Sequence, residues 1–139
     1  MSTDEIFALI VGATVEGCNG EVGDEMVQIR TDRGVLDLRH IQDCCEHVRL
    51  EDRIGDWSDI LGSQIVLLEE RSSSEDPEGY VEPDFRESYT WTFYEIRTTK
   101  GDITLRFLGE SNGYYGEEVY AYWTPKGGKT VADGALWPG

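Results

Sequence analysis

Apolar and polar residues alternate along two segments of the chain, residues 26–43 and 93–110. Alternation with a period of two predicts β-strands that bury one face. A turn at residues 31–34 divides the first segment and a turn at 98–101 divides the second, so each segment should fold into a β-hairpin. This register pairs apolar residues on one face of each hairpin: Ile29 with Leu36, Val27 with Leu38, Ile96 with Ile103 and Tyr94 with Leu105. The other face of each hairpin is polar, which supports the register.

The second segment repeats the first at a constant offset of 67 residues. Six of the 18 aligned positions are identical: Ile29/Ile96, Arg30/Arg97, Thr31/Thr98, Gly34/Gly101, Leu38/Leu105 and Arg39/Arg106. A weaker match at an offset of 50 places Gly12 over Gly62, each after a short helical turn and before an extended segment. Self-similarity of this kind marks a repeated structural unit. We therefore predict an α+β fold, mainly antiparallel β, in which two related half-repeats, about 6–50 and 56–122, lie around a pseudo-twofold axis and share one core.

The offset grows from 50 to 67 because the second half contains an insertion, residues 71–83. The insertion is polar and holds two prolines, which predicts an exposed, mobile loop. Further short strands are expected where apolar residues recur, at 48–50, 65–68 and 119–123. Residues 1–124 should form a single domain, since 139 residues bury enough surface for one core. Residues 125–139 lack any apolar period, so we expect a flexible C-terminal tail.

The chain is strongly acidic, with 28 Asp and Glu against 12 Lys and Arg and a net charge of −16. This surplus repels nucleic-acid phosphates and anionic membranes over about 8 Å in physiological salt. Direct binding to nucleic acid or to a membrane is therefore disfavoured. The same charge would suit a protein that imitates nucleic acid and occupies a basic groove of a partner, although a solvated acidic surface is the simpler explanation.

Three cysteines are a poor basis for a disulfide framework. Cys44 and Cys45 are adjacent and can scarcely bridge each other, and a bridge from either to Cys18 leaves an odd thiol. We therefore expect reduced thiols and a reducing compartment. The first residues, Met1 to Glu5, lack the pattern of a signal peptide, and no apolar run approaches the about 18 residues that span a bilayer. These features predict a cytoplasmic protein.

The densest group of potential metal ligands consists of His40, Asp43, Cys44, Cys45, Glu46 and His47. Zinc usually takes about four ligands from separated segments, whereas here there is one segment, and adjacent cysteines on a strand point to opposite faces. A cysteine nucleophile with a histidine base is the enzymatic alternative, but neighbouring acids raise the pKa of a thiol. We therefore predict buried structural thiols and expect no metal, no cofactor and no catalytic residue. His40 matches Phe107 in the repeat, which predicts a histidine at the edge of the core.

Two unusual strings end the two repeats at equivalent places, residues 42–47 and 109–115. If they converge, they would form a site for a polar ligand, with an arginine of the repeat at its rim. The candidate ligand-binding residues are Asp43, Glu46, Arg106, Glu110, Ser111, Asn112 and Tyr115. Arginines that the repeat retains at 30, 39, 97 and 106 offer guanidinium groups that suit phosphate or carboxylate. Pairing with nearby acids on the surface is the simpler role for them.

Four strings of the sequence carry a resemblance to a known family: His40-x-Gln42-Asp-Cys-Cys-Glu46, Glu69-Glu-Arg71, Ser88-Tyr-Thr-Trp-Thr-Phe-Tyr94 and Gly109-Glu-Ser-Asn-Gly-Tyr-Tyr115. In these strings the chain resembles a family of small proteins that are encoded mainly by bacteriophages and known only as a domain of unknown function. The likeness covers roughly Leu9 to Tyr122. It implies a phage setting and supplies no activity.

The sequence thus favours a non-enzymatic phage accessory protein in the cytoplasm of the infected host cell. Such a protein would bind a host protein or other host component, or a small polar ligand, and it would act against a host defence. The alternatives are a metal- or thiol-dependent enzyme that uses the segment from Asp43 to Glu46, and an acidic mimic of nucleic acid. The sequence does not predict an oligomeric state.

Overall fold

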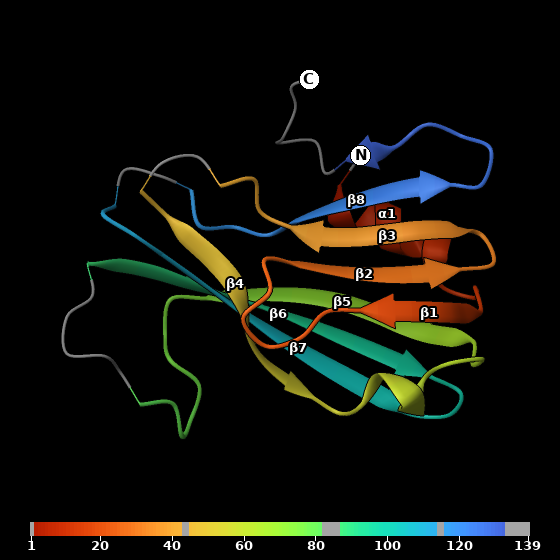
Figure 1. Ribbon diagram of the computed structural model, residues 1–139, viewed down its shortest axis with the longest axis horizontal. Helices are drawn as coiled ribbons and strands as arrows, with labels where there is room; N and C mark the ends of the chain where they lie inside the picture. Colours follow the sequence, from red (N-terminus) through yellow and green to blue (C-terminus); the bar gives the residue numbers. More distant parts are fainter. Residues whose placement is uncertain (1, 43–44, 82–86, 114–115, 133–139) are drawn as a thin grey trace.

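The computed structural model describes residues 2–42, 45–81, 87–113 and 116–132. Within these residues the chain forms two antiparallel sheets and a single α-helix (Figure 1). The first sheet has the order β1 (Val15–Asn19), β2 (Met26–Thr31), β3 (Gly34–Arg39), β8 (Tyr120–Pro125) and β9 (Val131–Ala132). The second has the order β4 (His47–Ile54), β7 (Asp102–Ser111), β6 (Ser88–Thr98) and β5 (Ile65–Ser73). The prediction of a mainly antiparallel β fold with a small helical part is confirmed.

The helix α1 (Thr3–Ile10) begins with a capping box, in which Ser2 and Glu5 exchange side-chain and backbone hydrogen bonds. Such a box satisfies backbone N–H groups that have no partner inside the helix. The helix buries Ile6, Phe7 and Ile10 on one side, as the helical period requires. It packs against β5 and β8 and therefore touches both sheets.

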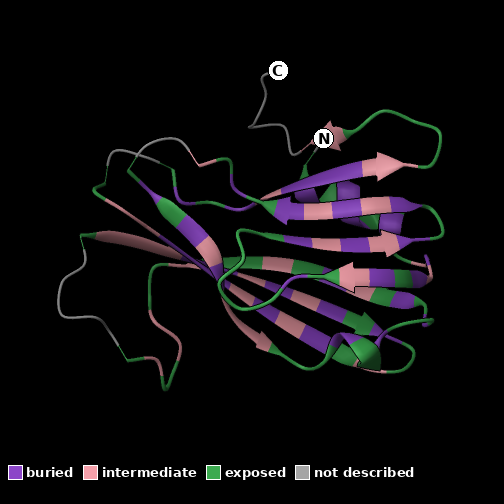
Figure 2. Ribbon diagram, in the orientation of Figure 1, coloured by how far each residue is buried: buried purple, intermediate pink, exposed green. Residues whose placement is uncertain are grey.

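Both sheets and α1 contribute to one continuous apolar core. In Figure 2 the buried residues alternate with exposed and intermediate ones along the strands of both sheets. Tyr94 lies at the centre of the aromatic packing, with its ring perpendicular to that of Phe107 and edge-on to that of Phe7. Edge-to-face pairs of this kind add to the free energy gained by burial.

The two predicted hairpins are present, with the predicted register. Ile29 pairs with Leu36 and Val27 with Leu38, while Ile96 pairs with Ile103 and Tyr94 with Leu105. The turns are also built alike. The Thr31 hydroxyl donates to the Gly34 carbonyl oxygen at 2.9 Å, and the Thr98 hydroxyl donates to the Gly101 carbonyl oxygen at 2.7 Å.

Matching backbone hydrogen bonds join the first segments of the two halves, residues 12–15 and 62–65. The Gly12 N–H donates to the Ile65 carbonyl, and the Gly62 N–H donates to the Val15 carbonyl, both at 2.8 Å. The bonds from Val15 to Ser63 and from Ile65 to Ala13 are both 2.9 Å long. Each pair is equivalent at the offset of 50. Two copies of one structural unit would make these matching hydrogen bonds. A twofold axis that relates the two copies stays a prediction.

Each half contributes its last strand to the sheet of the other half. After β3 the chain crosses to the second sheet, where β4 pairs with β7, and after β7 it returns to the first sheet, where β8 pairs with β3. A short 3-10 turn, η1 (Trp57–Asp59), separates β4 from β5. The exchange interlocks the halves, because neither sheet is complete without a strand from the other half.

Two predicted irregular segments are partly ordered. The insertion begins inside β5, and its loop packs against Trp91 through Asp76 and Tyr80, so the described part of the insertion is not simply an exposed loop. The predicted tail contains β9, which pairs with Tyr122 and Trp123 after a turn at Gly127. That turn brings the chain back along the open edge of β8. The segment has no apolar period, so the sequence pattern did not predict a strand there. Flexibility of the end stays a prediction, since residues 133–139 lie outside the described residues.

Candidate binding site

The end of the first string runs beside the start of the second string in the second sheet. The strand β4 begins at His47, the last residue of the first string, and there His47 pairs with Glu110 and Val48 with Gly109. Two of the candidate residues, Asp43 and Tyr115, lie outside the described residues. That all seven candidates line one concavity therefore stays a prediction.

The described candidates of these strings face different partners. Glu46 lies 2.8 Å from the imidazole Nε2 of His40, and Glu110 accepts a bond of 2.7 Å from Arg49. Ser111 donates to the carboxylate of Glu117, whereas Asn112 is exposed. The arginine beside Glu110 is thus Arg49, which the repeat did not mark, and Arg106 lies further along β7.

His40 lies at the edge of the core, as predicted, and both of its ring nitrogens have partners. Its Nδ1 is 2.7 Å from the Glu118 carbonyl oxygen. A carbonyl oxygen only accepts, so Nδ1 carries a hydrogen. The contact between Nε2 and Glu46 then holds one shared proton, either as imidazolium and carboxylate or as neutral imidazole and carboxylic acid. His40 is therefore committed to this contact and is not placed to act as a general base.

Glu117 is a buried acid that sequence patterns did not mark. Its side chain accepts hydrogen bonds from Thr90, at 2.8 Å, and from Ser111. The segment that carries it crosses Gly109, where a Cβ atom would lie 2.5 Å from the Glu117 carbonyl oxygen. The string from Gly109 to Ser111 thus serves the fold, because the missing side chain and the hydroxyl both hold the crossing segment in place.

The cysteines differ from each other in state. Cys18 is a free, half-buried thiol, and burial raises its pKa to about 11 although the charge of Arg30 acts in the opposite direction. Cys45 is disulfide-bonded. The expectation of reduced thiols is therefore wrong for Cys45. Among the described side chains no group of three or more His, Cys, Asp and Glu is placed to hold a metal ion.

The four repeated arginines do not gather around one point. Arg97 and Arg106 lie on the second sheet and pair with Glu95 and Asp52, at 3.4 and 3.5 Å. Arg30 and Arg39 lie on the first sheet, where Arg30 bonds to Asn19 and Gln28 and Arg39 lies over the ring of Tyr122. Pairing with nearby acids, the simpler of the two expected roles, is what the contacts of Arg97 and Arg106 show, whereas the contacts of Arg30 and Arg39 are with amide side chains and an aromatic ring.

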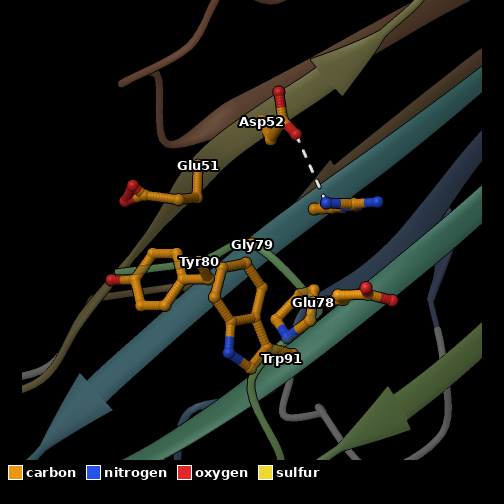
Figure 3. A pocket seen from close by; sticks show the side chains of 8 residues that line it. Glu51, Asp52, Glu78, Gly79, Tyr80 and Trp91 are labelled. Atoms are coloured by element: carbon orange, nitrogen blue, oxygen red, sulfur yellow. Dashed lines mark ion pairs between the residues drawn. The ribbon is translucent and has the colours of Figure 1, made fainter. Parts of the chain in front are cut away.

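A cavity of about 290 Å³ lies on the face of the second sheet that points away from the core (Figure 3). Trp91 of β6 and Leu108 of β7 pair across the sheet and are buried, yet neither belongs to the shared core. They lie on the opposite face, where the insertion covers Trp91. The residues that line the cavity are Glu51 and Asp52 of β4, Arg106 of β7, Trp91 of β6 and Pro77 to Tyr80 of the insertion.

The aromatic rings of the cavity are held by the insertion. The ring centroids of Tyr80 and Trp91 are 4.9 Å apart with the rings at 83°, and the Trp91 indole N–H donates to Asp76 at 3.0 Å. In Figure 3 the ring of Tyr80 lies beside that of Trp91, and Glu51 and Asp52 lie together on β4. Apolar residues 91, 93 and 108 on the otherwise polar face of the second hairpin were the signal that could have revealed a covered site next to the insertion.

A family model matches residues 8–121 of the chain. The chain belongs to this family, described as a domain of unknown function (DUF7448). The matched range of the DUF7448 domain contains nearly all of both halves and every residue that lines the cavity, whereas β9 falls outside it. No curated protein and no solved structure matches the chain. In the described part of the chain there is also no helix of the length and apolarity that crossing a membrane requires.

Proposed function

We propose that this member of the DUF7448 family is a non-enzymatic phage accessory protein that binds a host protein or a small polar ligand in the cytoplasm of the infected cell. Its binding site would be the cavity over Trp91, and its effect would be to counteract a host defence. The observation that carries the proposal is the origin of the cavity: one wall of it is formed by residues 77–80 of the insertion. The first half folds into an equivalent hairpin without such an insertion, so the fold does not need this wall.

The arrangement of the candidate catalytic groups supports binding over catalysis. His40, Glu46 and Glu117 are held in buried contacts that stabilise the fold, and Cys45 is disulfide-bonded. A thiol mechanism at Cys45 would need a reduced sulfur with a base beside it. The cavity, in contrast, combines apolar walls with a few charged groups, which is the usual composition of a ligand site.

Affinity capture from infected host cells tests the proposal. Arg106→Ala should change capture of the partner at least tenfold, lowering it for an anionic or neutral partner and raising it for a cationic one. The melting temperature should stay nearly unchanged, because Arg106 and Asp52 are a partly exposed pair and such pairs contribute less than about 1 kcal/mol. Arg97→Ala is the matched control, since Arg97 makes a similar ion pair on the same sheet and does not line the cavity.

Asn112→Ala separates the cavity from the terminal strings as the site of recognition. If it abolishes capture and Arg106→Ala leaves capture unchanged, the strings recognise the partner and the cavity does not. If neither variant changes the set of captured proteins or small molecules, the proposal is wrong.

The net charge of −16 favours one second candidate, an acidic mimic of nucleic acid. Such a protein would displace DNA or RNA from a basic groove, and its affinity would fall steeply as the salt concentration rises. The test is competition between this protein and nucleic acid for the captured partner, measured at two salt concentrations. It distinguishes the mimic from a ligand-binding protein.

A further inference from the structure

The charges around the cavity over Trp91 are unbalanced. Glu51 accepts a bond of 3.0 Å from Arg49, and Asp52 lies 3.5 Å from Arg106. The third carboxylate, Glu78, makes no hydrogen bond or ion pair with any residue in the described part of the chain, and it is exposed at the cavity. Three carboxylates would repel an anionic ligand, whereas a cationic ligand could pair with Glu78, the carboxylate that has no counter-charge. The net charge of −16 favours the cation further.

The walls of the cavity suit the stem of a long side chain. Trp91, Tyr80 and Pro77 provide apolar surface, and the indole N–H is already bonded to Asp76. The volume of about 290 Å³ is at the low end of ligand pockets, which favours a single side chain over a large cofactor. Arginine and lysine both place an aliphatic stem along apolar surface and a charged head among polar groups. A guanidinium also forms paired hydrogen bonds with a carboxylate and stacks on aromatic rings, which an ammonium does not.

We propose that the cavity binds an arginine side chain from a basic segment of a partner protein. The aliphatic stem would lie between Pro77, Tyr80 and Trp91, and the guanidinium would pair with Glu78. This inference rests on the proposed function, since it names the partner chemistry of the same site. It also gives the acidic character of the chain a specific role, because a negative surface guides a basic segment toward the cavity.

Titration of the full chain with the peptide acetyl-Gly-Arg-Gly-amide, followed by the NMR shift of the Trp91 indole N–H, tests the inference. We expect saturable binding with a Kd of about 1 mM, which corresponds to roughly 4 kcal/mol. The same peptide with citrulline in place of arginine has the same shape without the charge. It should bind at least tenfold more weakly.

Glu78→Gln removes the unpaired carboxylate from an exposed loop without a buried contact. It should weaken binding of the arginine peptide about tenfold, whereas Glu75→Gln, in the same loop but away from the cavity, should leave it unchanged. Equal binding of the citrulline peptide, equal effects of the two variants, or stronger binding of inorganic phosphate than of the arginine peptide would overturn the inference. Capture of a host partner that depends on Arg106, together with no peptide binding, would overturn this inference and leave the proposed function standing.

Discussion

Replacing His40 by phenylalanine, the residue at the equivalent position 107 of the second half, should destabilise the protein by about 3 kcal/mol. The side chains of His40 and Glu46 are only 7% and 2% exposed, and their contact is 2.8 Å long. Phenylalanine fits the apolar surroundings but removes both the hydrogen-bond partner of Glu46 and the donor to the Glu118 carbonyl. Removing one partner of a buried pair costs about 3–5 kcal/mol, and the lost bond to the carbonyl adds about 1 kcal/mol. The added apolar burial offsets about 1–2 kcal/mol of this total cost.

The double variant His40→Phe with Glu46→Leu isolates the interaction between the two side chains. Replacing both members of a buried pair by apolar residues is often neutral, so the double variant should regain at least half of the lost stability. The measurement is urea unfolding at pH 7, with the free energy of unfolding extrapolated to water and combined in a double-mutant cycle. For a chain of this size, a loss of 3 kcal/mol corresponds to a fall of about 10 °C in Tm.

A deficit below about 1 kcal/mol at pH 7, or a double variant no more stable than His40→Phe, would refute the reasoning that the contact between His40 and Glu46 holds the first string in place.

Three further predictions follow from particular contacts. Gly109→Ala should cost more than about 2 kcal/mol in urea unfolding, because the new Cβ would lie 2.5 Å from the Glu117 carbonyl oxygen; a stability equal to that of the wild type would contradict the close crossing. Thr31→Val and Thr98→Val should cost about 1–2 kcal/mol each and add when combined, because each hydroxyl makes the same bonds in its turn; clearly unequal losses would argue against equivalent turns. The Cys18 thiol has a pKa of about 11 against an ordinary 9.0, so alkylation by iodoacetamide at pH 8 should be about 100-fold slower than in the unfolded chain; equal rates would show that the thiol is not buried.

Those parts of the fold that depend on neighbouring residues could be predicted from the sequence. The register of each hairpin follows from the alternation around a short turn, and turns of the same residues, Thr31 to Gly34 and Thr98 to Gly101, close both hairpins. The position of His40 followed from its apolar counterpart, Phe107, because equivalent positions in a repeat face equivalent surroundings.

Contacts between distant segments could not be predicted in this way. The strands β4 and β8 are short apolar segments that would fit the edge of either sheet, and their exchange is decided by pairing over more than fifty residues, as between Leu36 and Trp123 or Leu50 and Phe107. The partners of Glu117 were equally hidden, because an isolated acid after a glycine-rich string has no periodic pattern that marks it as buried.

The cavity arises where the second half departs from the first, and this is why a search for shared residues found only one of its lining side chains. Arg39 and Arg106 occupy equivalent positions, but Arg39 lies over an aromatic ring of β8, while Arg106 faces Asp52 of β4. Trp91 lies two residues before the second copy of the repeat, where the first half has Asp24, a loop residue. Repetition marks what both halves need in order to fold, so a site that only one half carries must be sought among the residues that do not repeat. The insertion next to Trp91 meets that condition, and the experiments on Arg106 and Glu78 test whether it carries the function.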